Sequence, residues 1–135
     1  MQKVFLVEDS PLVRSRLAAL LGGLPDTRVV GHASGAKEAV QAILAARPDI
    51  VVLDLKLAQG TGFDVLIELH EKAPGIDCYM LTNFSAEPYR RQAARLGAHD
   101  FFDKTNEFER VRDVVAQRAA HRSTEGSTTC QPSSH

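Results

Sequence analysis

Five short apolar runs, each rich in β-branched or aromatic residues, lie between residues 4 and 102 of the chain. We predict strands over residues 4–7, 28–33, 50–53, 77–81 and 100–102. Three of these runs are almost continuously apolar, which is typical of strands that helices cover on both faces of a sheet. The pattern therefore favours a buried parallel sheet.

The segments that follow these runs repeat their apolar residues with the period of an α-helix. The clearest stripe consists of Val13, Leu17, Leu20, Leu21 and Leu24. Similar stripes lie within residues 40–44, 65–69 and 108–115, and a weaker one covers about 86–96. Ser10 followed by Pro11 is a typical start for the first of these helices, since serine caps the helix and proline suits its first turn.

Strand and helix alternate five times, which predicts an α/β fold with a parallel sheet covered by helices on both faces. We expect a doubly wound, flavodoxin-like, five-stranded sheet with the strand order 2-1-3-4-5 and five helices. Residues 1–121 are assigned to this single domain. Residues 122–135 are rich in Ser and Thr and lack large apolar side chains, so we expect them to form a disordered tail.

Composition narrows the classes of function. The formal net charge is −1, which argues against binding nucleic acid through bulk charge. No apolar run approaches the roughly 18 residues of a membrane span, so membrane insertion is not expected. The two cysteines, Cys78 and Cys130, fit no metal or disulfide spacing, which favours a reduced, cytoplasmic setting.

Chemically capable side chains stand where four of the predicted strands end. Glu8 and Asp9 follow the first strand, Asp54 follows the third, Thr82 follows the fourth, and Lys104 comes just after the fifth. In the order 2-1-3-4-5 these strands are neighbours, and open parallel sheets bind ligands beyond their carboxyl ends. We therefore expect these side chains to converge on one site.

Three carboxylates in one cleft repel one another, so the cluster is expected to hold a cation. Hard oxygen ligands suit Mg²⁺, which keeps several waters and accepts phosphate oxygens as further ligands. An aspartate can accept a phosphoryl group as a nucleophile, while a metal and a lysine neutralise the developing charge. The combination indicates phosphoryl transfer to an aspartate.

The order and spacing of these residues resemble the receiver domains of two-component response regulators, over residues 3–120. Residues 54–62 are similar to the loop that follows the phosphoacceptor in that family. The resemblance implies that Asp54 accepts phosphate from a phosphohistidine and that Thr82 and Lys104 bind the phosphoryl oxygens.

The resemblance also implies the metal site and the switch. Mg²⁺ would be bound by the carboxylates of Glu8, Asp9 and Asp54 and by the backbone carbonyl of Lys56. Thr82 and Phe101 would be the switch residues, and Phe101 stands three residues before the lysine. Such a domain catalyses its own phosphorylation and dephosphorylation without being a classical enzyme.

Several positions depart from the family pattern. Thr105 follows Lys104 where the family usually has a proline after a cis bond, and Asn83 follows Thr82 where a small residue is usual. Ala58 replaces an expected proline, and Phe101 lacks the hydroxyl of the usual switch aromatic. None of these changes removes a group that would act on the phosphate, and together they suggest a divergent branch of single-domain receivers.

The implied function is that of a stand-alone receiver, phosphorylated by a sensor histidine kinase or a histidine phosphotransfer protein. Its signal would leave through the face made by the fourth helix, the fifth strand and the fifth helix. The mixed charges of that face suit a downstream protein target or a homodimer, with no direct contact to nucleic acid. They come from Arg90, Arg91, Arg95, Glu107, Glu109, Arg110, Arg112 and Asp113. The three arginines of the fourth helix fit a solvated face or a partner surface.

Two other functions fit parts of the pattern. A pseudo-receiver, acting as a phosphorylation-independent interaction module, is favoured by Asn83 and Thr105 and opposed by the intact acidic residues and Lys104. A flavin electron carrier of the same fold would need a phosphate-binding loop after the first strand. Residues 8–11 read Glu-Asp-Ser-Pro there, and their negative charge would repel a flavin phosphate.

Overall fold

The apolar runs form one parallel sheet in the order β2-β1-β3-β4-β5 in the computed structural model, which describes residues 1–128. The predicted fold and strand order are thereby confirmed. The strands are β1 (Gln2–Val7), β2 (Thr27–Ala33), β3 (Ile50–Leu53), β4 (Asp77–Thr82) and β5 (Asp100–Asp103). Most extend slightly beyond the predicted runs because polar residues also pair, as Gln2 does with Thr27 and Thr82 with Asp103.

Five helices connect or follow these strands, as predicted. They are α1 (Pro11–Gly22), α2 (Ala36–Ala46), α3 (Gly62–Lys72), α4 (Glu87–Arg95) and α5 (Arg110–Thr128). Within residues 1–128, none has the combination of length and apolar character needed to span a membrane.

The end of α5 differs from the expected domain boundary at residue 121. The helix continues to Thr128, so residues 122–128 of the expected tail are helical. Extending a helix that has already formed costs little per residue, and a polar composition does not by itself stop it. Residues 129–135 of the expected tail lie outside the described residues.

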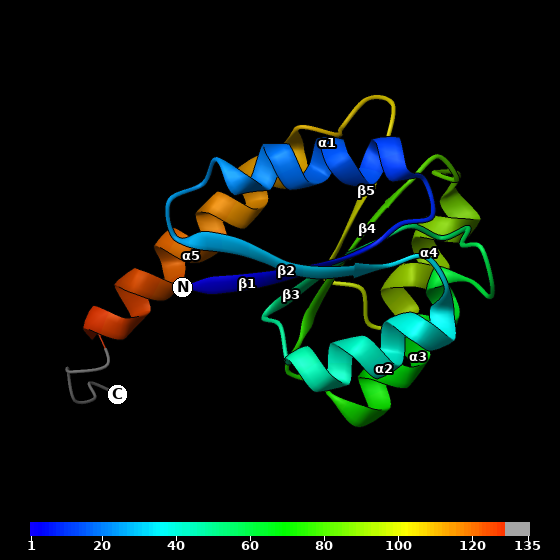
Figure 1. Ribbon diagram of the computed structural model, residues 1–135, viewed down its shortest axis with the longest axis horizontal. Helices are drawn as coiled ribbons and strands as arrows, with labels where there is room; N and C mark the ends of the chain where they lie inside the picture. The colour runs from blue at the N-terminus through cyan, green and yellow to red at the C-terminus, as the bar shows by residue number, and fades with distance from the viewer. Residues whose placement is uncertain (129–135) are drawn as a thin grey trace.

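The sheet is covered on both faces (Figure 1), which explains why the central strand β3 is apolar at every position. On one face, Leu6 and Phe102 pack with α1 and α5. On the other, Val7 and Leu53 pack with α2, α3 and α4. The helix α4 adds little apolar surface to this core, because among its residues Glu87–Arg95 only Ala93 is buried.

Two helices begin at the carboxyl edge of the sheet with well-formed caps. The Ser10 hydroxyl accepts a hydrogen bond from the Val13 backbone N–H at 3.3 Å, as its position before Pro11 predicts. At α3, Thr61 and Asp64 form a reciprocal capping box. The segments after β1 and β3, which carry the acidic residues, are therefore anchored to rigid helices.

Gly62 sits in close contact with the segment that contains Asp54. Its backbone N–H donates to the Leu55 carbonyl at 2.7 Å, and Lys56 and Thr61 form an antiparallel bridge that closes the loop. A Cβ atom at position 62 would overlap the Asp54 carbonyl oxygen, well inside van der Waals contact. Only glycine fits there without moving the backbone of Asp54.

The Gly62→Ala variant should therefore lower the free energy of unfolding by about 2 kcal/mol, as overpacking of a tight contact does. Chemical denaturation measures this change. Gly22→Ala is the matched control, since a Cβ at position 22 meets no atom within 4 Å. Equal stabilities of the two variants would contradict the close contact.

Candidate functional site

Three of the predicted site residues meet directly at the carboxyl edge of the sheet. The Lys104 ammonium lies 2.7 Å from Asp54 Oδ2 and 2.8 Å from Glu8 Oε1. Glu8 and Asp54 are buried, and only 11% of the Lys104 side chain is exposed. One lysine, which follows β5, thus bridges the carboxylates that directly follow β1 and β3, as the strand order predicts.

Each carboxylate is also held by the backbone. The second oxygen of Glu8 accepts a hydrogen bond from the Ser10 N–H at 3.0 Å, and Asp54 Oδ1 accepts one from the Leu55 N–H at 2.7 Å. Charged acceptors make stronger hydrogen bonds than neutral ones. The orientation of both carboxylates is therefore fixed before any ligand binds.

The electrostatics of the site follow from burial and pairing. Burial raises the pKa of Glu8 above its usual value, although hydrogen bonds from Lys104 and Ser10 oppose the shift. Burial alone would lower the pKa of Lys104, but its hydrogen bonds to Asp54 and Glu8 raise it overall. Lys104 is therefore a permanent cation at neutral pH.

The acidic residues have a geometry suited to a divalent cation. One oxygen each from Glu8, Asp9 and Asp54 lies within 4.8 Å of the others. Asp9 is exposed, so the cluster opens to solvent on that side. Buried hard oxygen donors with an open side fit Mg²⁺, which retains waters when it binds. The side chain of Lys56, whose carbonyl we predict as a further ligand, is exposed.

Thr82 stands at the end of β4, beside the lysine. Its side chain is fully buried, and its hydroxyl oxygen accepts a hydrogen bond from the Phe84 N–H at 3.2 Å. Its carbonyl accepts the Lys104 N–H at 3.0 Å. Thr82 is therefore coupled to the lysine through the backbone, and its hydroxyl is engaged with the loop between β4 and α4.

Phe101 lies on β5, partly buried against the core beneath α4. The Arg90 guanidinium covers its ring at 4.8 Å and also pairs with Glu107 at 3.4 Å. Arg90 further donates to the Ser85 carbonyl at 2.9 Å. The sequence analysis left a solvated face or a partner surface open for Arg90; in the structure its guanidinium contacts aromatic and acidic side chains of this same domain.

The structure also shows a contact that the sequence analysis missed. Asp103, the residue before Lys104, accepts hydrogen bonds from the Thr105 N–H and the Ser85 hydroxyl, both at 2.8 Å. The peptide bond between Lys104 and Thr105 is trans, since residues 1–128 contain no cis peptide bond. An aspartate side chain often accepts a hydrogen bond from the backbone N–H two residues later and so forms a turn. Asp103 before Thr105 is the sequence signal that could have revealed this contact.

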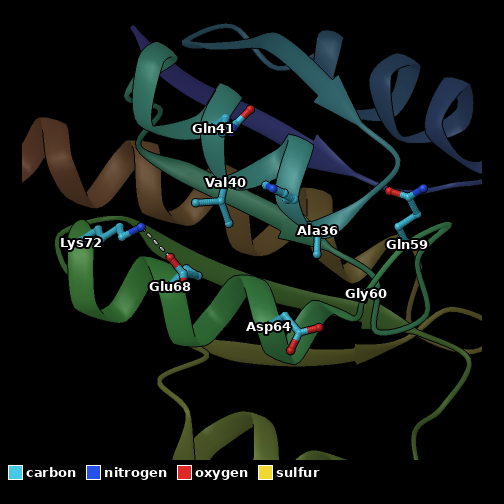
Figure 2. A pocket seen from close by; sticks show the side chains of 9 residues that line it. Ala36, Val40, Gln41, Gln59, Gly60, Asp64, Glu68 and Lys72 are labelled. Atoms are coloured by element: carbon cyan, nitrogen blue, oxygen red, sulfur yellow. Dashed lines mark ion pairs between the residues drawn. The ribbon is translucent and has the colours of Figure 1, made fainter.

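A separate groove of about 500 Å³ runs between α2 and α3 (Figure 2). Gln59 and Gly60, from the loop after β3, close one end of it, and Glu68 and Lys72 form an ion pair at 2.7 Å along it. None of the site residues described above lines this groove. The acidic edge of the sheet is therefore the better candidate for the site.

Comparisons with known proteins agree with this geometry. Residues 4–116 match the family model described as the response regulator receiver domain. The DNA-binding transcriptional activator DevR/DosR of Mycobacterium tuberculosis is 38% identical over 104 residues, which cover 77% of this chain and 48% of that protein. A protein-glutamate methylesterase/protein-glutamine glutaminase of Carboxydothermus hydrogenoformans is 33% identical, over 81% of this chain and 32% of that protein. The chain thus spans about half the length of these relatives or less.

Solved structures give the same result. The response regulator domain of Thermotoga maritima CheB superposes with a TM-score of 0.80 at 26% identity, over 90% of this chain and 95% of that one. A LuxR-family two-component response regulator from Aurantimonas gives 0.79 at 27% identity, over 87% and 85% of the two chains. The chain therefore belongs to the response regulator receiver domain family.

Proposed function

We propose that this receiver accepts a phosphoryl group on Asp54, in a Mg²⁺-dependent reaction, from a phosphohistidine of a sensor histidine kinase or a histidine phosphotransfer protein. The observation that carries the proposal is the contact of Lys104 with both Asp54 and Glu8, beside a cluster of three carboxylates. Lysine and acids are thus already arranged around one nucleophile.

In the proposed reaction an Asp54 carboxylate oxygen attacks the phosphorus of the phosphohistidine. A new O–P bond forms, the N–P bond breaks, and its electron pair stays on the imidazole nitrogen. Lys104, held 2.7 Å from Asp54 Oδ2, can neutralise charge on the incoming phosphoryl oxygens, and the Thr82 hydroxyl can donate to them. When bound at Glu8, Asp9 and Asp54, Mg²⁺ would supply further charge neutralisation.

Attack of water on the acyl phosphate would reverse the modification, returning the Asp54 carboxylate and inorganic phosphate.

A pseudo-receiver remains the second candidate, favoured by Asn83 and Thr105. The pairing of Lys104 with Asp54, both largely buried, argues against it. Burying two charged side chains costs solvation free energy, and an interaction module without phosphorylation does not require that pair.

The output of the receiver is proposed to be a protein contact. The face formed by α4, β5 and α5 carries the mixed charges noted in the sequence, and phosphorylation is proposed to alter it through Thr82 and Phe101. A downstream protein or a homodimer fits this face, whereas the near-neutral net charge gives no support for nucleic acid binding. The cytoplasmic setting stays a prediction. The stand-alone character also stays one, because the relatives are longer proteins.

The first test of the proposal is the phosphorylation of Asp54 itself. With Mg²⁺ and acetyl phosphate, the wild-type protein should gain one hydroxylamine-sensitive phosphate, measured by intact-protein mass spectrometry. Asp54→Asn should gain none, because the amide is not a nucleophile. Asp113→Asn, which removes an exposed carboxylate on α5, should behave as the wild type.

Two results would contradict this assignment. One is labelling of Asp54→Asn at the wild-type level, which would place the phosphate elsewhere. The other is full labelling in the presence of EDTA, which would show that the acidic cluster needs no metal.

The lifetime of the phosphorylated state is proposed to be long. In the family, the positions two residues after the threonine and two after the phosphoacceptor flank the path by which water approaches the phosphate. In this chain these positions are Phe84 and Lys56. Phe84 is 40% exposed and packs edge-on against Tyr89 at 5.8 Å, and it offers no group to orient a water. Lysine is not suited to orient and activate water as a general base, and the long side chain of Lys56 can pair with the phosphate.

Replacing either residue should therefore speed the loss of phosphate. Alanine at position 84 opens the path of water to the phosphate, and asparagine at position 56 offers a polar group that can orient the water. Phe84→Ala and Lys56→Asn should each lose the label several-fold faster than the wild type, followed by mass spectrometry after removal of the donor. Ile67→Ala, another exposed apolar residue, on α3, is the control and should not change the rate. Loss within seconds from the wild type, or no acceleration in either variant, would overturn the idea.

A further inference from the structure

The loop between β5 and α5 holds Lys104 without the proline that the family pattern leads us to expect. Thr105 keeps a backbone N–H that proline lacks, and the peptide bond before it is trans. A lysine side chain has four rotatable bonds, so holding its ammonium in one place has an entropic cost. Something other than a proline ring must therefore fix the backbone from which Lys104 reaches into the site.

The Asp103 carboxylate is placed to do this. Its Oδ1 accepts hydrogen bonds from the backbone N–H groups of Thr105, at 2.8 Å, and Asn106, at 3.4 Å. Its Oδ2 accepts a hydrogen bond from the Ser85 hydroxyl at 2.8 Å. One side chain thus folds the loop back on itself and ties it to the loop after β4.

The backbone of Asp103 is held as firmly as its side chain. Its N–H donates to Glu107 Oε1 at 2.9 Å, and its carbonyl accepts the Glu107 N–H at 2.8 Å. Glu107 is in turn paired with Arg110 at 2.7 Å, and with Arg90 at 3.4 Å. The β4–β5 register also places Asp103 beside Thr82, whose carbonyl accepts the Lys104 N–H.

We propose that Asp103 is a positioning residue for Lys104: its carboxylate fixes the backbone on both sides of the lysine so that the ammonium reaches Asp54 and Glu8. This inference rests on the proposed function, in which Lys104 serves phosphoryl transfer to Asp54. Because the Asp103 carboxylate contacts Ser85, Thr105 and Asn106 and neither Asp54 nor Glu8, it acts through Lys104 and not on the phosphate.

The charge state of Asp103 agrees with this role. Hydrogen bonds from the Ser85 hydroxyl and the Thr105 N–H lower the pKa of Asp103. The group is therefore ionised at neutral pH, and its hydrogen bonds are charge-assisted. An asparagine at this position would keep one carbonyl oxygen for the Thr105 N–H but would lose the charge.

The experiment compares two measurements on the same set of variants. The first is the rate of phosphorylation by acetyl phosphate with Mg²⁺. The second is the rate at which a small amine-modifying reagent labels Lys104 relative to Lys3, mapped by mass spectrometry. Lys3 is partly buried at the opposite end of the sheet, where its ammonium donates to the Ala46 carbonyl at 3.3 Å, and it reports general loosening of the fold.

Asp103→Ala should slow phosphorylation about 10- to 100-fold, the usual cost of misplacing a reacting group. It should also raise the labelling of Lys104 severalfold relative to Lys3, because the ammonium leaves its two carboxylates. Asp103→Asn should recover most of both values. Ser85→Ala, which removes only the donor to Oδ2, should shift both values in the same direction by less.

Asp100→Ala is the matched control. Asp100 lies at the other end of β5 and also accepts a backbone hydrogen bond, from the Phe101 N–H at 2.9 Å. It should leave both measurements at the wild-type level.

The proposal is overturned if Asp103→Ala matches the wild type in both measurements. It is also overturned if Lys3 labelling rises together with that of Lys104, since the variant would then loosen the whole domain. Failure of the proposed function looks different. The wild type would take up no phosphate, while Lys104 labelling would still rise in Asp103→Ala and support the positioning role.

Discussion

The contact of one largely buried lysine with two buried carboxylates is the interaction on which this site depends. Glu8 and Asp54 come from different strands and would repel each other in a site largely shielded from water. Lys104 compensates part of that charge, at 2.8 Å and 2.7 Å, and leaves the exposed Asp9 to add negative charge at the mouth. Three carboxylates thus face one lysine, in an arrangement that could hold a metal ion.

Much of the surrounding structure serves to aim these three groups. Gly62 lets α3 begin against the Asp54 carbonyl, and Ser10 both caps α1 and donates its N–H to Glu8. The Asp103 turn fixes the chain around Lys104. Each device acts on the backbone next to a functional side chain, so the site is prepared by local structure at the ends of the strands and not by the apolar core alone.

The fold and the positions of the main groups could be predicted because both follow from local patterns. Continuous apolar runs identify buried strands, and the strand order then brings Glu8, Asp54 and Lys104 together. The contacts of Asp103 with Ser85 and of Arg90 with Glu107 could not be predicted, because the partners lie 18 and 17 residues apart in the sequence. The contact of Asp103 with the Thr105 N–H is local and carries a turn signal. The helical continuation of α5 to Thr128 was missed because composition alone does not show where a helix ends.

The way in which α4 is attached has a consequence for the energetics of signalling. Ala93 is its buried residue, so little apolar surface joins this helix to the sheet. Arg90 supplies much of the remaining attachment, through its contacts with Phe101, Glu107 and the Ser85 carbonyl. Elements with few buried apolar contacts open at low free energy. A helix with so little buried apolar surface can therefore shift without disturbing the core.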